Sequence, residues 1–247
     1  MHAETQHDDF PNGTHTLEEL VAALPRRHDD DPDIVEVLYT PAIARVLAYA
    51  VVKGHLKAAF LKPTTAQSAL RAEFRANVLT PQLWEKIAEH HKNPAETETH
   101  IPPQFSYPYY DPTPEYLTEM QKFHFDIVSD VDATKIILTS MILARTPNNA
   151  EGGFYPEFHT DDFPASLYTA IKGAGMRYVI GNLSKKERKL YSKDAEKFAA
   201  SLPKNRIGTV EPGITAIFNP DLIHQSSPRV REEGQLVVVS DYEISSV

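Results

Sequence analysis

The chain has 247 residues, of which 41% are hydrophobic and 24% are charged, a composition typical of a folded globular protein. Lys and Arg number 25 against 34 Asp and Glu, so the formal net charge is −9, which argues against a nucleic-acid or anionic-membrane partner. Cysteine is absent. Disulfides, thiolate metal sites and a cysteine nucleophile are therefore excluded, and any metal must be held by nitrogen and oxygen ligands.

Residues 1–32 are polar and carry no apolar run of the signal-peptide type. Their acid clusters, at residues 7–9 and 28–31, predict a solvated and mobile surface. The longest apolar stretch, residues 43–52, contains Arg45 and is too short to span a bilayer. We expect a cytoplasmic protein with no membrane partner, organised as one domain over residues 1–247. The sequence does not indicate an oligomeric state.

Apolar residues of the N-terminal third recur at the three- and four-residue spacing of a helix. The pattern runs from residue 33 to about residue 92 and includes Ile34, Val37, Leu38, Ile43, Val46 and Leu47. Pro81 fits the first turn of a further helix. The proline-rich residues 93–114 predict an irregular, stiff loop whose aromatic side chains pack on the body or cover a pocket. With a helix predicted at residues 115–128, residues 33–130 are expected to form a mainly helical support.

The pattern changes after residue 130, where short apolar runs alternate with turn signals. Strands are predicted at residues 135–143, 154–160, 167–171, 176–180, 215–218 and 235–242. A charged helical insert at residues 184–202 begins with the capping pattern Ser184-x-x-Glu187. Closely spaced strands without alternating helices favour an antiparallel sandwich or barrel over a βαβ fold. The sequence thus predicts an α+β protein.

Metal-binding chemistry is indicated by a His-x-Asp pair. Five histidines have an acid two positions later: His2, His7, His28, His124 and His159. In a strand, residues i and i+2 point to the same face and can converge on one ion, whereas on a helix they lie about 200° apart. His124 has a helical context, and the first three histidines lie in polar segments. Only His159 with Asp161 follows a strand-like aromatic run, so this pair is the candidate.

A third ligand is expected farther along the chain. Residues 211–213 form a turn that leads into an apolar strand, and His224 follows that strand. The interval between His159 and His224 is long enough for several strands to return the chain to one site. Two histidines and one carboxylate on one face of a metal form the facial triad of non-haem iron(II) oxygenases. An ordinary hydrogen-bonded histidine is the alternative interpretation of His224.

Residues 135–242 resemble the iron(II)/2-oxoglutarate-dependent oxygenases, and three short segments carry the resemblance. The pieces are FHTD at 158–161, EPGITAIF at 211–218 and HQSSPRVR at 224–231. The resemblance implies a double-stranded β-helix (jelly-roll) core over residues 131–247, with Fe(II) held by His159, Asp161 and His224, and with 2-oxoglutarate and O2 as cosubstrates. It also implies C–H oxidation of a small molecule, a free amino acid or a biosynthetic intermediate, by hydroxylation, desaturation or oxidative cyclisation. Residues 1–130 match no family.

The resemblance further implies a basic residue beyond the distal histidine, which pairs with the far carboxylate of 2-oxoglutarate. Many members carry it ten or more positions later, where this chain has Gly234 and Gln235. Arg231, or alternatively Arg229, fills this role if the intervening loop is short, because guanidinium binds a carboxylate through two hydrogen bonds. The other interpretation places both arginines on the surface.

A few further side chains are candidates for ligand contact. Ser226 or Ser227 would add a hydroxyl to the cosubstrate carboxylate. Lys172 and Arg177 flank a glycine turn and would receive a substrate carboxylate, with simple surface exposure as the alternative. Phe158 is a candidate for substrate contact.

Two other function classes remain open. One is a cupin-like metal enzyme that uses the triad without 2-oxoglutarate, and the other is a non-catalytic jelly-roll binding protein whose histidines are structural. Succinate production separates the first from the oxygenase, and metal analysis separates the second. A small-molecule partner is expected in preference to nucleic acid because the net charge is −9.

Overall fold

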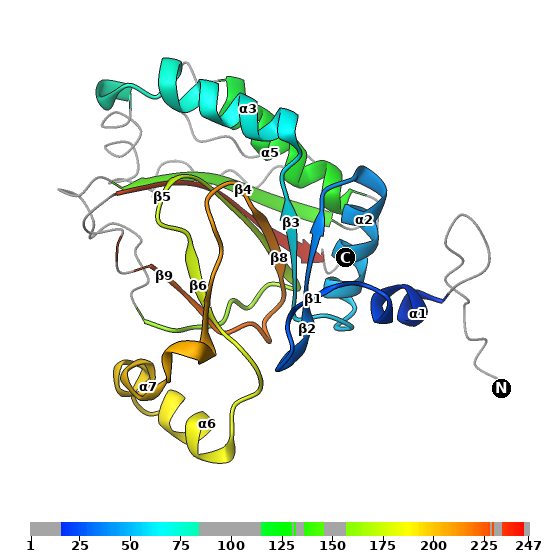
Figure 1. Ribbon diagram of the computed structural model, residues 1–247, viewed down its shortest axis with the longest axis vertical. Coiled ribbons are helices and arrows are strands. Elements are labelled where there is room, and N and C mark those ends of the chain that lie inside the picture. The colour runs from blue at the N-terminus through cyan, green and yellow to red at the C-terminus, as the bar shows by residue number, and fades with distance from the viewer. Residues whose placement is uncertain are drawn as a thin grey trace.

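A computed structural model describes residues 16–83, 115–129, 131, 136–145, 157–227, 229 and 234–244. In these residues, helices cover one face of a large sheet, and a small sheet lies against the other face (Figure 1). The N-terminal elements are α1 (Leu17–Ala22), β1 (Arg26–His28), β2 (Asp31–Leu38), α2 (Pro41–Val52), β3 (Ala58–Lys62), α3 (Thr65–Glu73), the π-helix η1 (Phe74–Val78) and α5 (Glu115–Val128).

The C-terminal half supplies the strands of the core. They are β4 (Ile136–Arg145), β5 (Ala165–Gly173), β6 (Met176–Val179), β7 (Ile207–Thr209), β8 (Thr215–Phe218), β9 (His224–Ser226) and β10 (Gln235–Ile244). Helices α6 (Lys185–Tyr191) and α7 (Ala195–Ser201) and the 3-10 helix η4 (Lys204–Arg206) form an insert between β6 and β7. The large sheet has the order β1-β2-β3-β8-β5-β10-β4, and the small sheet has the order β7-β6-β9.

The strand order is that of a jelly roll. The large sheet contains the antiparallel series β8-β5-β10-β4, and the small sheet β7-β6-β9 is extended by a bridge between His159 and His224. Residues 174–175 join β5 to β6, residues 210–214 join β7 to β8, and residues 227–234 join β9 to β10. The strands that these links join occupy matching positions in the two sheets, in the orders β8-β5-β10 and β7-β6-β9. Thus β7 lies across from β8, β6 from β5, and β9 from β10. The predicted α+β fold with a jelly-roll core is confirmed.

Both faces of the large sheet are apolar, because side chains alternate along a strand. Leu167 and Ile217 belong to the outer cluster, which includes apolar residues of α2 and α5. Tyr168, Ala216 and Val237 belong to the inner cluster, which includes residues of β6. This alternation identifies which residues of each strand face the interior of the core.

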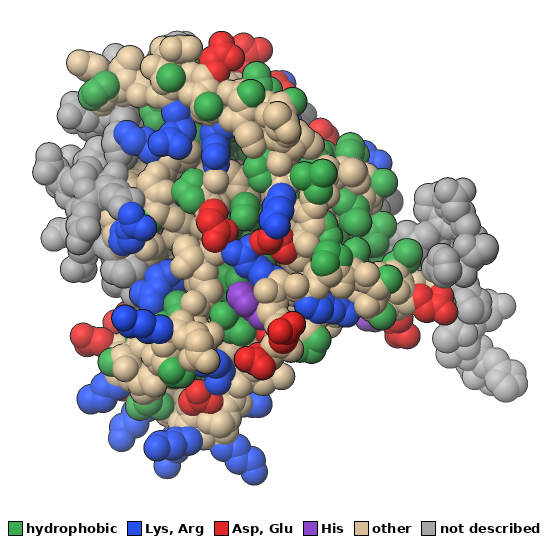
Figure 2. Space-filling view, in the orientation of Figure 1, with side chains coloured by type: hydrophobic (Ala, Val, Ile, Leu, Met, Phe, Trp, Pro, Cys, Tyr) green, Lys and Arg blue, Asp and Glu red, His purple; other side chains and the backbone are tan. Residues whose placement is uncertain are grey.

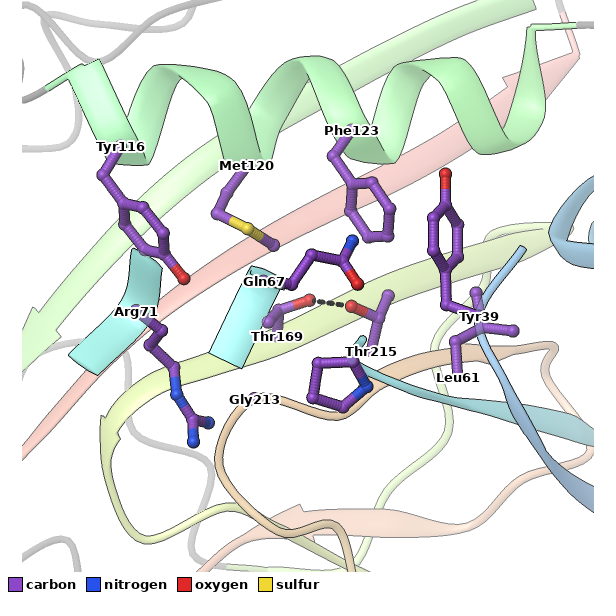
Figure 3. Close-up of a pocket in the computed structure, with 11 residues that line it drawn as sticks. Tyr39, Leu61, Gln67, Arg71, Tyr116, Met120, Phe123, Thr169, Gly213 and Thr215 are labelled. Atoms are coloured by element: carbon purple, nitrogen blue, oxygen red, sulfur yellow. Dashed lines mark hydrogen bonds between the residues drawn. The ribbon is translucent and has the colours of Figure 1, made fainter. Parts of the chain in front are cut away.

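A chain of buried hydroxyl groups crosses the outer face beneath α5. His124 Nδ1 lies 2.9 Å from the Ser240 hydroxyl, and His124 Nε2 lies 2.8 Å from the Thr169 hydroxyl. The Thr169 hydroxyl lies 2.7 Å from the Thr215 hydroxyl. The two threonines line a cavity of about 20 Å³ between α3, α5 and the sheet (Figure 3), which has room for one water. His124 is thus a hydrogen-bonded core residue on a helix, as its helical context predicted.

Two expectations for the N-terminal part are wrong. Residues 33–38, expected to be helical, belong to β2, which pairs with β1 and runs parallel to β3. Ile34 and Val35, at the centre of β2, are buried on opposite faces of the sheet, so the apolar residues of β2 mimic helical spacing. The acid cluster at 28–31 is a solvated surface only at Asp29 and Asp30, which are exposed. Asp31 is buried and lies 2.8 Å from Lys57 Nζ, and His28 Nε2 lies 2.7 Å from the Tyr178 hydroxyl. Most of the described residues in the N-terminal region are nonetheless helical.

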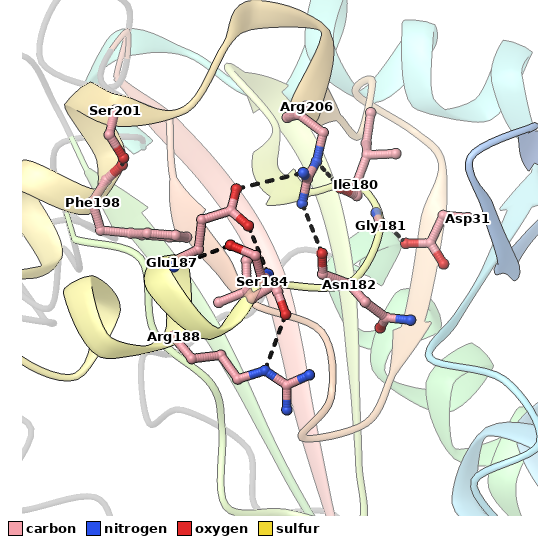
Figure 4. Close-up of polar contacts among 11 residues, drawn as sticks. Asp31, Ile180, Gly181, Asn182, Ser184, Glu187, Arg188, Phe198, Ser201 and Arg206 are labelled. Atoms are coloured by element: carbon pink, nitrogen blue, oxygen red, sulfur yellow. Dashed lines mark hydrogen bonds and ion pairs between the residues drawn. The ribbon is translucent and has the colours of Figure 1, made fainter.

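The charged insert forms as predicted, with Ser184 and Glu187 making a capping box at the start of α6. Arg206 joins the insert to the small sheet: its Nε donates to the Ile180 carbonyl at 2.5 Å, and its Nη2 donates to the Asn182 carbonyl at 3.2 Å (Figure 4). Lys and Arg side chains gather on this insert (Figure 2). Most of the helix expected after Pro81 and the aromatic loop 93–114 lie outside the described residues.

Within the described part of the chain, no helix combines the length and apolar character needed to cross a membrane.

Candidate metal centre

His159, Asp161 and His224 converge at the small sheet. His159 and His224 form a β-bridge in which each amide donates to the other's carbonyl at 2.8 Å, so both side chains point inward with ring centroids 4.3 Å apart. Asp161 Oδ1 lies 3.6 Å from His159 Nε2, and Asp161 Oδ2 lies 3.6 Å from His224 Nε2. One ligand atom from each residue lies within 4.8 Å of the others.

The two imidazole rings are oriented by backbone carbonyls. His159 Nδ1 donates to the Glu157 carbonyl at 3.0 Å, and His224 Nδ1 donates to the Leu222 carbonyl at 3.1 Å. A carbonyl only accepts, so Nδ1 carries the hydrogen in both rings. Each Nε2 therefore directs its lone pair toward Asp161, which is the arrangement that a metal-binding histidine needs.

Burial controls the charge of the site. His224 is buried, whereas His159 and Asp161 are partly exposed, so the cluster is accessible from one side. Burial lowers the pKa of His224 to about 4, and the opposing effect of the Asp161 carboxylate does not cancel it. His224 is thus neutral at neutral pH, and the neutral imidazole is the form that binds a metal.

The donor set fits a divalent metal. Two imidazole nitrogens and one carboxylate come together, and this is the ligand set of the non-haem iron(II) facial triad. The spacing of the ligand atoms leaves room for an ion between them. The structure brings together the three residues that the sequence singled out, and their role as iron ligands remains a prediction.

The inner wall near the centre contains residues that the sequence analysis did not single out. The Phe218 ring lies 4.7 Å from the His224 ring. At the start of β10, Gln235 Nε2 donates to the Tyr168 hydroxyl at 2.8 Å and to the Ala174 carbonyl at 2.7 Å. Gln235 occupies the position after the distal histidine where the resemblance implies a basic residue, and this offset is the sequence signal that could have identified it.

The residues predicted to bind 2-oxoglutarate have different positions. Ser226 pairs with Met176, which belongs to the inner cluster, so Ser226 lies on the same face of β9 as His224. Ser227 is buried, and its hydroxyl accepts from the Arg229 amide at 3.4 Å. The Arg229 side chain is exposed, and Arg231 lies outside the described residues.

The structure does not bring the three predicted substrate-binding residues to the metal centre. Phe158 is buried under the insert, with its ring centroid 6.0 Å from that of Phe198. Arg177 alternates with inward-facing neighbours and therefore lies on the outer face of the small sheet. Lys172 pairs with Leu236 of the outer cluster, and burial together with the charge of Arg75 lowers the pKa of Lys172. Strand alternation thus removes all three from the inner wall.

A groove of about 560 Å³ lies between the insert and the start of β3. It is lined by Thr160, Arg188, Tyr191 and Ile223, among others. Thr160 stands between His159 and Asp161 in the chain, and strand alternation places it on the opposite face from these two residues. The groove therefore lies behind the metal centre and is separated from it by the small sheet.

Comparison with known proteins gave matches only to solved structures. No family model and no curated protein matches the sequence. An N-substituted L-amino acid dioxygenase from Burkholderia ambifaria AMMD, in complex with alpha-KG, aligns with a TM-score of 0.39 and 12% identity over 83% of this chain and 91% of its own. A Pseudomonas putida prolyl-4-hydroxylase aligns with a TM-score of 0.38 and 14% identity, covering 81% of this chain and 95% of its own.

A third structure is that of the Fe(II)/(alpha)ketoglutarate-dependent dioxygenase TqaL. It aligns with a TM-score of 0.38 and 10% identity, covering 83% of this chain and 89% of its own. These values record a distant likeness over most of the chain, and the jelly-roll assignment rests on the strand order of the two sheets described above. The chain is similar, at low identity, to structures of iron(II)/2-oxoglutarate-dependent dioxygenases.

Proposed function

We propose that the protein is a non-haem iron(II)/2-oxoglutarate-dependent oxygenase that oxidises a C–H bond of a small molecule. The observation that carries the proposal is the convergence of His159 Nε2, His224 Nε2 and the Asp161 carboxylate, with both Nδ1 atoms held by backbone carbonyls. Bound iron(II), with 2-oxoglutarate and O2, would supply the oxidising chemistry and release succinate and CO2.

The chain's own residues would then bind and orient the reactants. His159, Asp161 and His224 hold the metal from one side and leave its other positions open. Ser226, on the same face of β9, offers a hydroxyl to the cosubstrate, and Arg231 or Arg229 pairs with its far carboxylate. Phe218 and the apolar inner cluster exclude water from the space beside His224.

The substrate in this proposal is a free amino acid or a biosynthetic intermediate. The inner wall supports a small molecule, because apolar side chains dominate it and polar groups are few and fixed, as in pockets for small ligands. Hydroxylation, desaturation and oxidative cyclisation all use the same three ligands, so the reaction type follows from how the substrate is positioned.

The proposal is tested by titrating the metal-free protein with Fe(II) and 2-oxoglutarate without oxygen. Chelation of iron by 2-oxoglutarate is expected to give a visible charge-transfer band. Asp161→Ala removes a ligand and should weaken Fe(II) binding by more than about 100-fold, while the circular dichroism spectrum stays that of the parent. Asp162→Ala, at the exposed neighbouring position, is the matched control and should retain the band.

The outcomes separate the function classes. Iron binding without the band, and no succinate on adding oxygen, would indicate a metal enzyme that does not use 2-oxoglutarate. A protein that binds no Fe(II), or an Asp161→Ala variant that binds it as tightly as the parent, would refute the metal centre and leave a jelly-roll binding protein.

A further inference from the structure

The groove behind the metal centre is lined by charges of both signs. Arg188 of α6 lines it from the insert, whereas Asp33 of β2 and Asp221, in the link between β8 and β9, line it from the core. Lys57 also lines the groove, but its ammonium group is buried and paired with Asp31. The charges that remain for a ligand are one guanidinium group and two carboxylates.

The two aspartates belong to one side of the groove. The Lys57 amide donates to the Asp33 carbonyl at 2.9 Å, and the Asn219 amide donates to the Lys57 carbonyl at 3.1 Å. Asn219 Oδ1 in turn accepts from the Asp221 amide at 3.0 Å. These bonds hold the three backbone segments together. In the described part of the chain, neither the Asp33 nor the Asp221 carboxylate has a hydrogen bond or an ion pair.

Arg188 lines the groove from the side of the insert with a guanidinium group that is only partly used. Its Nε donates to the Leu183 carbonyl at 3.0 Å, and among the described residues its two Nη atoms have no partner (Figure 4). Arg188 therefore forms no ion pair with the aspartates that line the same groove. A free guanidinium edge of this kind binds a carboxylate through two hydrogen bonds.

The rest of the lining suits a carbon chain. Val179, Leu183 and Ile223 belong to the apolar cluster beneath the insert, and the groove has a volume of about 560 Å³, which is in the range of pockets for small organic ligands. An anion alone would meet the two carboxylates, and a cation alone would meet the guanidinium group. A ligand with one charge of each sign satisfies both sides.

We infer that this groove is an accessory binding site for a zwitterion with an apolar body, namely an amino acid or a short peptide. Arg188 binds the carboxylate of the ligand, and Asp33 and Asp221 bind its ammonium group. The apolar side chains of the ligand pack between these ends. The site lies behind the small sheet, apart from the metal centre, and does not rest on the proposed function.

The test measures binding to the full chain by calorimetry, without Fe(II) and 2-oxoglutarate and again with both in the absence of oxygen. The probes are L-leucine and the dipeptide L-leucyl-L-leucine, which carry the same two charges on molecules of different size. The N-acetylated dipeptide lacks the ammonium group, and the C-amidated dipeptide lacks the carboxylate. Each modified form keeps the apolar side chains.

At least one unmodified probe should bind the parent at millimolar concentration or below, and the tighter of the two identifies the size of the ligand. If the dipeptide binds, each modified form should bind about 10-fold more weakly, because one charge-assisted contact is lost. Binding should be the same with and without Fe(II) and 2-oxoglutarate.

The variants assign each charge. Arg188→Gln should weaken binding of the unmodified probe by about 10-fold and leave binding of the amidated form unchanged, since that form has no carboxylate to lose. The double variant Asp33→Asn/Asp221→Asn should do the same for the acetylated form. Lys189→Gln, which removes an exposed charge from α6 outside the groove, is the matched control and should bind as the parent does. Thermal unfolding checks that each variant retains the fold.

Four results would overturn the inference: neither unmodified probe binds at millimolar concentration, the modified dipeptides bind as tightly as the parent dipeptide, the variants retain full affinity, or binding requires Fe(II) and 2-oxoglutarate. The last result would place the ligand at the metal centre. The charge-transfer titration is an independent measurement. Zwitterion binding that depends on Arg188, in a protein that gives no band, would refute the proposed reaction and retain the accessory site.

Discussion

At the scale of single residues, both histidines of the metal centre are oriented by local backbone. Each Nδ1 donates to the carbonyl two residues earlier in the chain, Glu157 for His159 and Leu222 for His224. The ring orientation and the tautomer are therefore set within a three-residue segment, before any metal binds. Such support restricts the rings to the arrangement in which both Nε2 atoms face Asp161.

His124 is a hydrogen-bonded core residue and not a candidate metal ligand, and it makes the free energy of unfolding depend on pH. Burial lowers its pKa to about 3, whereas in the unfolded chain it titrates near 6.5. Between pH 6.5 and pH 3 the unfolded state binds a proton that the folded state does not, so this residue makes stability fall as the pH falls. The slope reaches about 1.4 kcal/mol per pH unit.

The check is urea unfolding of the parent and His124→Gln at several pH values from 7 to 4. The variant loses stability at every pH because the hydrogen bonds to Ser240 and Thr169 change, but its free energy of unfolding should vary less with pH. Parallel pH profiles for the two proteins would contradict a neutral, buried His124.

At the scale of elements, the corners between the sheets set which strands face each other. The β5–β6 corner contains Gly175, and a Cβ added there would overlap the carbonyl oxygen of Val210, whose amide donates to Met176 at 2.8 Å. The corner thus depends on close contact between two backbone segments. This contact holds β6, the neighbour of β9, in position against the large sheet.

We expect Gly175→Ala to destabilise the protein by about 3 kcal/mol or more, because the backbone must move. Gly54→Ala is the matched control: Gly54 has φ +76° but nothing within 4 Å of the added Cβ, so it should cost only about 1–2 kcal/mol. Thermal and urea unfolding measure both. Equal losses for the two variants would show that the corner contact is not decisive.

At the scale of the whole molecule, a buried ion pair joins the N-terminal strands to the jelly roll. Asp31, at the start of β2, accepts from Lys57 Nζ at 2.8 Å and from the Gly181 amide at 2.6 Å. Lys57 immediately precedes β3, and Gly181 follows β6. One carboxylate thus links the added edge of the large sheet to the small sheet, on which the metal centre lies.

Removal of one partner leaves a buried charge unpaired. Asp31→Asn and Lys57→Met are each expected to lower the free energy of unfolding by about 3–5 kcal/mol. The double variant should lose less than the sum of the two, because no unpaired charge remains. A double-mutant cycle in urea measures the coupling, and strictly additive losses would show that the pair does not act as a unit.

The jelly-roll strands were predictable from sequence to within a few residues, since apolar runs bounded by turn signals marked β4, β5, β6, β8 and β10. The N-terminal strands were not. Ile34 and Val35 in β2 are buried on opposite faces of a sheet, and a strand with apolar residues on both faces loses the alternation that distinguishes it from a helix. The same ambiguity hid the buried role of Asp31, whose partners come from distant parts of the chain.

The sequence by itself determined which ligands a metal could have. The His-x-Asp spacing in an extended segment forces two side chains to one face, and the lack of cysteine leaves only nitrogen and oxygen donors. Only the tertiary structure decided which other residues face that site. It turned Lys172, Arg177 and Phe158 away and brought Phe218 and Gln235 to the inner wall, because the side of a strand that becomes the interior is fixed by the packing of the second sheet.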